Sequence, residues 1–298
     1  MPPRRNFGGG GGFRSTMSLG LPPFYGAVKW LVIVNSAIYL LMLVVQGVAP
    51  GVARGIYALG YLTPTAVMHG WIWQLVSYSF FHLGLFHILF NMITLWMFGA
   101  LLEQGGWRSN QFYEFYFTCV VGAAVTTIAV SYLGLVAPFT WLGVTPLTAT
   151  AGSSGGIYGI MIAVAVLYGD SEFMMFPLPI TIRAKYLVAI FVFISLAGAL
   201  QGGRGESVAN FAHLGGALVG YLYLKLLPRG GLMFATSERY YGVRNSYYRW
   251  KRRRAAKKFE VYMRKHDRSE FFDEYGNYRD PKDKEKGNGG SSNSNWVN

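Results

Sequence analysis

Charged residues are scarce in this chain of 298 residues. They make up 14% of the sequence, whereas apolar residues make up 52% and mean hydropathy is +0.27. A soluble domain carries roughly 25% charged residues, so this chain lacks the polar surface that a water-facing globule needs. The same apolar content excludes disorder of the chain as a whole.

Cysteine and acidic residues are rarer still. The single cysteine, Cys119, excludes an intramolecular disulfide and a cysteine-based metal cluster. No Asp precedes Asp170, and no H-E-x-x-H string occurs. Intramembrane aspartyl hydrolysis needs two carboxylates at depth, and zinc hydrolysis commonly uses that histidine motif. The sequence therefore argues against both classes, and we expect neither a metal nor a cofactor.

Six apolar runs predict an all-α membrane protein with six transmembrane helices. A bilayer core about 30 Å thick needs about 20 helical residues, and a shorter helix can be buried among others. We divide the chain into a flexible Gly-rich segment (1–28), a membrane domain (29–228) with a long first outer loop, and a basic, partly disordered tail (229–298). The runs cover residues 30–45, 83–102, 112–135, 154–168, 186–200 and 211–227.

Basic residues fall almost entirely on one side of this predicted topology. The side of both termini receives 25 of the 27 Lys and Arg residues, and the other side receives Arg54 and Arg204. The positive-inside rule then predicts cytoplasmic termini in a plasma (inner) membrane. Basic and aromatic residues interleave over 238–268, which favours anionic lipid rather than nucleic acid as the partner of the tail.

Polar side chains inside the apolar runs are functional candidates, because they are costly in lipid. They lie near the start of the second, fourth and sixth runs, and so at similar depth. Without a carboxylate, they offer a hydroxyl, imidazoles and an amide, the groups needed for acyl transfer. They are His82, His87 and Asn91; Gly152, Ser153, Ser154, Gly155, Gly156 and Tyr158; and Asn210 with His213.

Spacing assigns roles to some of these groups. Ser154 begins the fourth helix, where unpaired N–H groups and the helix dipole favour negative charge. His87 and Asn91 are four residues apart on one helix face, so both can point donors at one oxyanion. Asp170 lies about 24 Å beyond Ser154 along a helix and cannot orient the base, so we predict a Ser154–His213 dyad.

Each feature has a simpler explanation when taken alone. Gly/Ser clusters in membrane helices are usually packing features, and a lone transmembrane histidine is often one too. Small residues one turn apart let helix backbones approach closely, whether or not the site is catalytic. Their joint occurrence on three helices favours catalysis. The pairs of small residues are Gly155 with Gly159 and Gly216 with Gly220.

In this combination the strings resemble the rhomboid family of intramembrane serine proteases, of the bacterial six-span type. The resemblance covers about residues 66–227. It rests on His82-x-x-x-x-His87-x-x-x-Asn91, on Gly152-x-Ser154-Gly155 with Tyr158, and on Ala212-His213-x-x-Gly216 with Gly220.

The resemblance implies a role for each matched residue. Ser154 is expected to be the nucleophile and His213 the general base. His87, Asn91 and the backbone N–H of Ser154 are expected to donate hydrogen bonds to the oxyanion. Tyr158 is expected to stack on His213, with Gly152 and Gly155 in supporting places.

Three positions qualify or extend the match. Glu103, four residues after Gly99, resembles a structural Gly-x-x-x-Glu element of the family. Many relatives carry Trp-Arg where this chain has Trp73-Gln74, which leaves the anchoring of the first outer loop open. Ser153 adds a second hydroxyl near the helix start, and position alone does not exclude it as the nucleophile.

The expected activity is cleavage of transmembrane segments in membrane-protein substrates near the outer face. A non-proteolytic rhomboid-like protein that binds and guides membrane proteins is the alternative. A transporter or channel is disfavoured, because the runs lack pore carboxylates and repeat symmetry. The Gly-rich segment 201–210 is either a mobile cap over the site or an ordinary connection.

Overall fold

The computed structural model describes residues 22–175, 180–201, 206–226 and 231–265. The chain divides into two compact units, Met1–Leu232 and Met233–Asn298. The expectations for residues 1–21, for 202–205 in the Gly-rich segment and for 266–298 lie outside the described residues.

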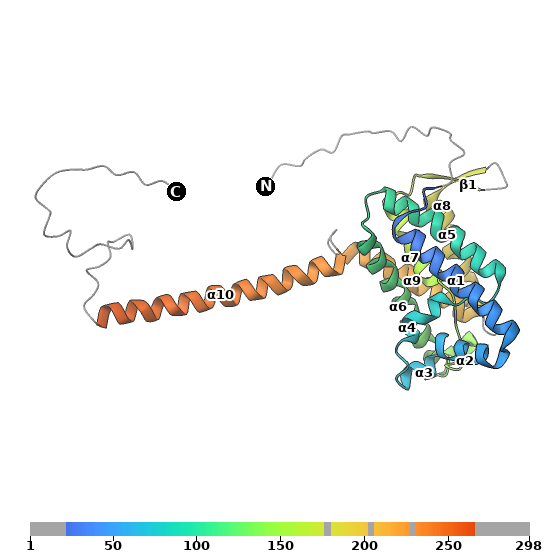
Figure 1. The fold of residues 1–298 in the computed structure, drawn as a ribbon, viewed down its shortest axis with the longest axis horizontal. Helices are drawn as coiled ribbons and strands as arrows, with labels where there is room; N and C mark the ends of the chain where they lie inside the picture. Colours follow the sequence, from blue (N-terminus) through green and yellow to red (C-terminus); the bar gives the residue numbers. More distant parts are fainter. Residues whose placement is uncertain (1–21, 176–179, 202–205, 227–230, 266–298) are drawn as a thin grey trace, which may run out of the picture. The chain divides into compact units, whose positions relative to one another are not determined.

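The first unit is an all-α membrane bundle, as predicted, with a small hairpin added (Figure 1). Three of its helices are long and apolar enough to cross a membrane, and two more are shorter apolar helices. The six bundle helices are α1 (Gly26–Val48), α5 (Leu85–Gln104), α6 (Ser109–Leu133), α7 (Ser154–Leu167), α8 (Ala184–Leu200) and α9 (Glu206–Leu226).

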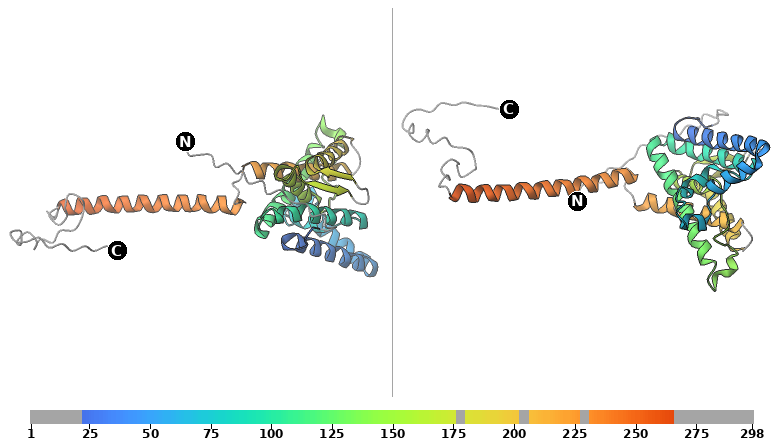
Figure 2. Two further views of the ribbon diagram at one scale, coloured as in Figure 1. Left: turned by 90° about the horizontal axis from the view of Figure 1, so that it is seen from above. Right: turned by 60° about the horizontal axis from the view of Figure 1, so that its bottom comes forward.

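Helix α7 is the centre of the bundle. It packs against α5, α6, α8 and α9, and α9 also packs against α6 and α8. In both views of Figure 2 the blue α1 lies at the edge, beside α5. Apolar side chains of α1 such as Leu40, Leu41 and Val44 are about 60% exposed. This outward apolar surface suits a helix that faces lipid.

The long loop between α1 and α5 is largely helical, which the sequence analysis did not anticipate. Pro50 and Pro64 occupy first-turn positions of two of its helices, where a missing N–H costs nothing. Its elements are α2 (Pro50–Gly60), α3 (Pro64–Met68), α4 (Gln74–Ser77) and the 3₁₀ turn η1 (Tyr78–Phe80).

Gln74, whose anchoring role the sequence analysis left open, anchors this loop. Its side chain is fully buried. Its Nε2 donates to the carbonyl oxygens of Ala58 (3.0 Å) and Leu59 (3.3 Å), and its Oε1 accepts from the N–H of Thr63 (3.0 Å). Trp73 Nε1 also donates to the Leu59 carbonyl, at 3.0 Å. A neutral amide therefore ties α2 to the segments that follow it.

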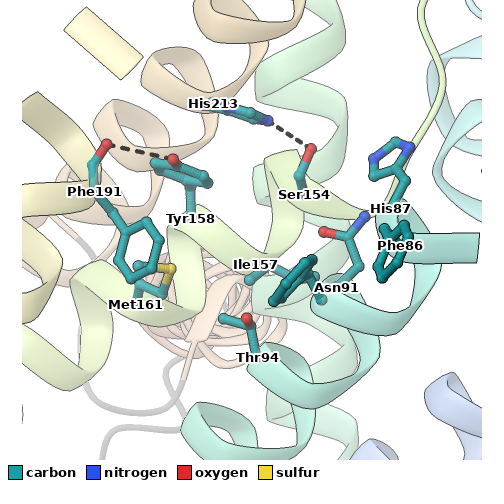
Figure 3. A pocket seen from close by; sticks show the side chains of 11 residues that line it. Phe86, His87, Asn91, Thr94, Ser154, Ile157, Tyr158, Met161, Phe191 and His213 are labelled. Carbon is teal, nitrogen blue, oxygen red and sulfur yellow. Dashed lines mark hydrogen bonds between the residues drawn. The ribbon is translucent and has the colours of Figure 1, made fainter. Parts of the chain in front are cut away.

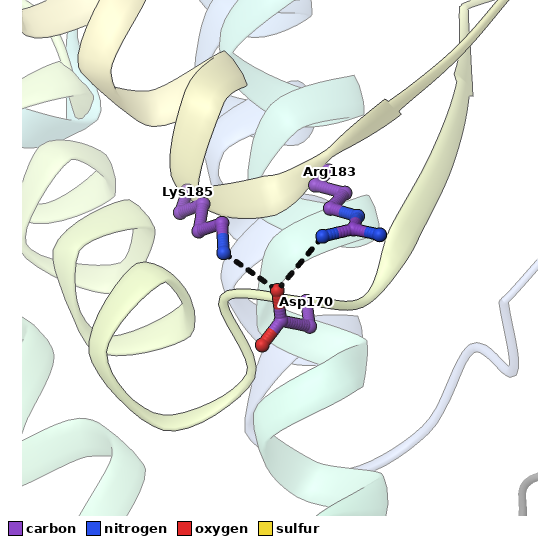
Figure 4. A network of polar contacts seen from close by, with 3 residues as sticks. All are labelled: Asp170, Arg183 and Lys185. Carbon is purple, nitrogen blue, oxygen red and sulfur yellow. Dashed lines mark hydrogen bonds and ion pairs between the residues drawn. The ribbon is translucent and has the colours of Figure 1, made fainter.

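A two-stranded hairpin joins α7 to α8, and the sequence analysis missed it. Strands β1 (Glu172–Met175) and β2 (Ile180–Arg183) pair antiparallel. Asp170 precedes β1 and accepts from Lys185 Nζ at 2.7 Å, with Arg183 at 3.5 Å (Figure 4). The hydrogen bond and charge of Lys185, with a smaller effect of Arg183, lower the pKa of Asp170 below its ordinary value.

The basic tail contains one long helix, α10 (Gly231–Lys265). Its described side chains are exposed, and most of them are aromatic or basic. Arg254 lies over the Trp250 ring, 5.3 Å from its centroid, and Arg244 lies over Tyr248 at 5.8 Å. The sequence analysis placed the basic aromatic segment here but did not predict that it is helical.

Candidate active site

Ser154 and His213 meet inside the bundle. Ser154 is the first residue of α7, and His213 lies in the middle of α9. Their Oγ and Nε2 atoms are 2.8 Å apart, which is hydrogen-bond distance (Figure 3). A hydroxyl at the N-terminal end of a helix also lies where the helix dipole favours a developing negative charge.

Two pairs of glycines allow this meeting. A Cβ built on Gly216 of α9 would collide with the backbone of Gly155 in α7. A Cβ on Gly220 would lie 2.8 Å from Cα of Gly159, one turn along each helix. The two backbones are therefore in direct contact, with no side chain between them.

Tyr158 stacks on the imidazole of His213. The ring centroids are 4.4 Å apart and the planes differ by 5°. Because Tyr158 follows Ser154 by one helical turn, α7 supplies both the hydroxyl and the ring that holds His213.

Ser195 of α8 completes this group, and the sequence analysis missed it. Its Oγ is 3.3 Å from Nδ1 of His213 and 2.7 Å from the hydroxyl of Tyr158. Ser195 is 1% exposed. It belongs to no motif, and its only signal in the sequence is that it is a polar residue within an otherwise apolar run.

His87 and Asn91 face the same cavity from α5, as their spacing predicts. His87 Nδ1 accepts from the N–H of Leu83 at 3.4 Å, which leaves Nε2 as the donor. Asn91 Nδ2 is buried and has no hydrogen-bond partner among the described residues. Two side-chain donors are thus available at one wall of the cavity.

Gly152 lies against the imidazole of His87, where a side chain would not fit. It adopts φ +128°, a conformation that side-chain-bearing residues rarely adopt. A Cβ there would lie 2.8 Å from Nε2 of His87. Glycine is therefore required both by the backbone conformation and by the neighbouring imidazole.

His82 does not lie on the second membrane helix, so its predicted placement was wrong. It precedes α5, which begins at Leu85 after an extended Gly84. Its Nε2 lies 3.2 Å from Oγ of Ser153, and both residues are buried. Ser153 thus pairs with His82, whereas Ser154 pairs with His213.

Two cavities meet at Ser154 and His213. The larger, about 300 Å³, lies between α5, α7 and α8 and is mostly apolar, with Phe86, Phe90 and Phe191 in its wall (Figure 3). The smaller, about 130 Å³, extends toward the segment 149–152 and the start of α9. Within the described ranges, no three His, Cys, Asp or Glu side chains are placed to hold a metal ion.

A family model for the rhomboid domain matches residues 69–230, more than half of the chain. The chain belongs to the rhomboid family. This rhomboid is 28% identical over 208 residues to Rhomboid-like protein 11, chloroplastic, from Arabidopsis thaliana, a match that covers 68% of this chain and 65% of that protein.

Two further relatives are similar over a shorter part. Rhomboid protein 1, mitochondrial, from Saccharomyces cerevisiae is 26% identical over 50% of this chain and 40% of its own length. Inactive rhomboid-related protein 2 from Caenorhabditis elegans is 27% identical over 53% of this chain and 41% of its own length. The matched part of this rhomboid spans about 40% to 65% of the length of each of these curated relatives.

Proposed function

We propose that this rhomboid is an intramembrane serine endopeptidase that uses Ser154 and His213 as a dyad. The observation that carries the proposal is the 2.8 Å contact between Ser154 Oγ and His213 Nε2 at the junction of two cavities. A hydroxyl paired with an imidazole, beside unpaired donors, is the arrangement that acyl transfer needs.

The reaction proceeds in two steps. Ser154 Oγ attacks the scissile carbonyl while His213 Nε2 takes its proton, and His213 then gives that proton to the leaving amine. Asn91 Nδ2, His87 Nε2 and the N–H of Ser154 donate to the oxyanion. His213 then takes a proton from water as the water attacks the ester, and it gives that proton to Ser154 Oγ as the second product is released.

The substrate is the transmembrane segment of a membrane protein. Its peptide bonds are shielded by their own hydrogen bonds while they are helical, so the segment must unwind locally before it is cut. The apolar cavity beside Phe86 and Phe90 receives the unwound chain, and the smaller cavity admits water from the outer face.

The distribution of Lys and Arg supports a plasma (inner) membrane location with both termini cytoplasmic. In that orientation α5, α7 and α9 enter from the outer face, and cleavage takes place near it. The exposed basic and aromatic side chains of α10 support binding of the tail to anionic lipid.

Cleavage of a single-span reporter in liposomes tests the proposal. We expect Ser154→Ala and His213→Ala to abolish cleavage, and Ser153→Ala to retain it, because Ser153 contacts His82 instead of the base. Undiminished cleavage in Ser154→Ala or His213→Ala would overturn the proposal. A wild-type chain that binds the reporter without cutting it would instead favour the non-proteolytic function.

A further inference from the structure

A line of three polar contacts begins on the far side of His213 from Ser154. His213 Nδ1 lies 3.3 Å from Ser195 Oγ, which lies 2.7 Å from the Tyr158 hydroxyl. The Tyr158 hydroxyl in turn donates to the carbonyl oxygen of Phe191, at 3.4 Å. Three helices contribute: α9 carries His213, α7 carries Tyr158, and α8 carries both Ser195 and Phe191.

One direction along this line gives every one of its groups a partner. A carbonyl oxygen can only accept, so in that direction Tyr158 donates its single hydroxyl proton to Phe191. The Tyr158 oxygen then accepts from Ser195, and the Ser195 oxygen is left to accept from His213 Nδ1–H. With the proton on Nδ1, a neutral imidazole has its lone pair on Nε2, which faces Ser154.

The arrangement differs from that of an ordinary serine in a membrane helix. Such a serine usually donates to the carbonyl four residues earlier in its own helix. For Ser195 that carbonyl belongs to Phe191, and the hydroxyl of Tyr158 donates to it. The contacts of the Ser195 hydroxyl are instead with Tyr158 and with the imidazole.

We propose that Ser195 is a positioning residue that, anchored through Tyr158 to the Phe191 carbonyl, holds His213 in the tautomer able to accept the proton of Ser154. The proposal rests on the proposed function, in which His213 is the base. It makes α8 part of the catalytic machinery, because that helix carries both the acceptor of Nδ1–H and the end of the line.

Kinetics of Ser195→Ala provide the first test. We expect kcat to fall about tenfold, which corresponds to about 1.4 kcal/mol, with little change in KM. The imidazolium also loses an acceptor, so the acidic limb of the kcat/KM profile shifts to lower pH. Ser195→Thr, which keeps the hydroxyl, restores both values, and Tyr158→Phe, which keeps the stacked ring, lowers kcat.

Ser131→Ala is the matched control. Ser131 is a buried serine of α6, and its Oγ has no partner among the described residues. We expect this variant to keep both kcat and the pH profile. If Ser195→Ala only lowered thermal stability, with kcat and the acidic limb unchanged, Ser195 would be a packing residue and the proposal would be wrong.

The tautomer can be observed without any turnover. We suggest ¹⁵N NMR of histidine-labelled Ser154→Ala protein, with His213 assigned by its loss in His213→Gln. We expect a protonated Nδ1 at neutral pH, and a mixture of tautomers when Ser195→Ala is added. A proton on Nε2, or an unchanged spectrum in the double variant, would overturn the proposal. An inactive wild-type chain with the expected spectrum would count against the proposed function alone.

Discussion

Gly216 of α9 lies directly against the backbone of Gly155 in α7, with no room for a Cβ between them. Ser154 precedes Gly155, and His213 precedes Gly216 by almost one turn. This backbone contact therefore sets the distance between the hydroxyl and the imidazole. The distance between the proposed nucleophile and base therefore depends on the absence of a side chain at Gly216, which takes no part in the proposed chemistry.

Gly216→Ala tests this dependence. The added methyl must push α9 away from α7, so we expect a loss of about 1–3 kcal/mol of stability and a fall in activity of at least tenfold. Gly55→Ala in α2 is the control, because nothing lies within 4 Å of a Cβ built there. Reporter cleavage and thermal unfolding measure both effects, and a fully active Gly216→Ala variant would contradict the close approach.

Asn91→Ala tests the donor wall of the cavity. Removal of one oxyanion donor typically costs 10²–10³ in kcat, and we expect a loss of about 10² with KM nearly unchanged. Asn110→Ala, at an exposed position of α6, is the control. Steady-state kinetics on the reporter decide the question. A rise in KM alone would place Asn91 in substrate binding and not in stabilisation of the transition state.

Gln74→Ala tests the anchor of the loop between α1 and α5. The change leaves the carbonyls of Ala58 and Leu59 and the N–H of Thr63 without their partner. We expect about 2–4 kcal/mol of lost stability. Gln46→Ala removes an exposed glutamine that accepts one hydrogen bond, from Tyr57, and should cost far less. Equal melting temperatures for the two variants would contradict the anchoring role.

The carboxyl of Asp170 should titrate below its ordinary pKa of 3.8, because Lys185 stabilises the ionised form. A pKa that is lower in the folded state adds stability above pH 3.8, and that stability is lost as the pH falls through the lower, folded value. ¹³C NMR of the carboxyl measures this titration. We expect Lys185→Gln to raise the pKa more than Arg183→Gln does. Titration at or above 3.8 in the unsubstituted chain would contradict the contact.

A peptide of residues 231–265 should bind vesicles more tightly as their anionic lipid content rises. Each Lys or Arg near such a surface contributes about 1 kcal/mol, so we expect replacement of Arg252, Arg253 and Arg254 by Gln to weaken binding by about 100-fold. Co-sedimentation with anionic and neutral vesicles measures this difference. A response that is flat with lipid charge would argue against the lipid role.

Apolar runs located the bundle helices well, but they gave poor boundaries where the helix ends are polar. Helix α7 ends at Leu167, one residue short of the predicted run, whereas α9 begins at Glu206 and not at Phe211. Helix α9 begins with the polar residues Glu206 and Ser207, and Asn210 follows, so hydropathy does not reveal its start. Hydropathy does not detect α10 either, because that helix is rich in charged residues.

From the motifs we predicted that Ser154, His213, His87 and Asn91 lie close together, because their order and spacing place them at similar depth on neighbouring helices. In the structure all four line one cavity. The motifs did not reveal Ser195, since its contacts with Tyr158 and His213 arise only when α8 packs beside α7 and α9. His82 was misplaced for a local reason: Gly84 is extended, and α5 starts after it.

Labelling with a serine-directed fluorophosphonate, followed by mass-spectrometric mapping of the adduct, tests the central claim most directly. An activated hydroxyl paired with His213 predicts a single adduct on Ser154 that disappears in Ser154→Ala and His213→Ala and persists in Ser153→Ala. An adduct on Ser153, or labelling that survives in Ser154→Ala, would contradict the account.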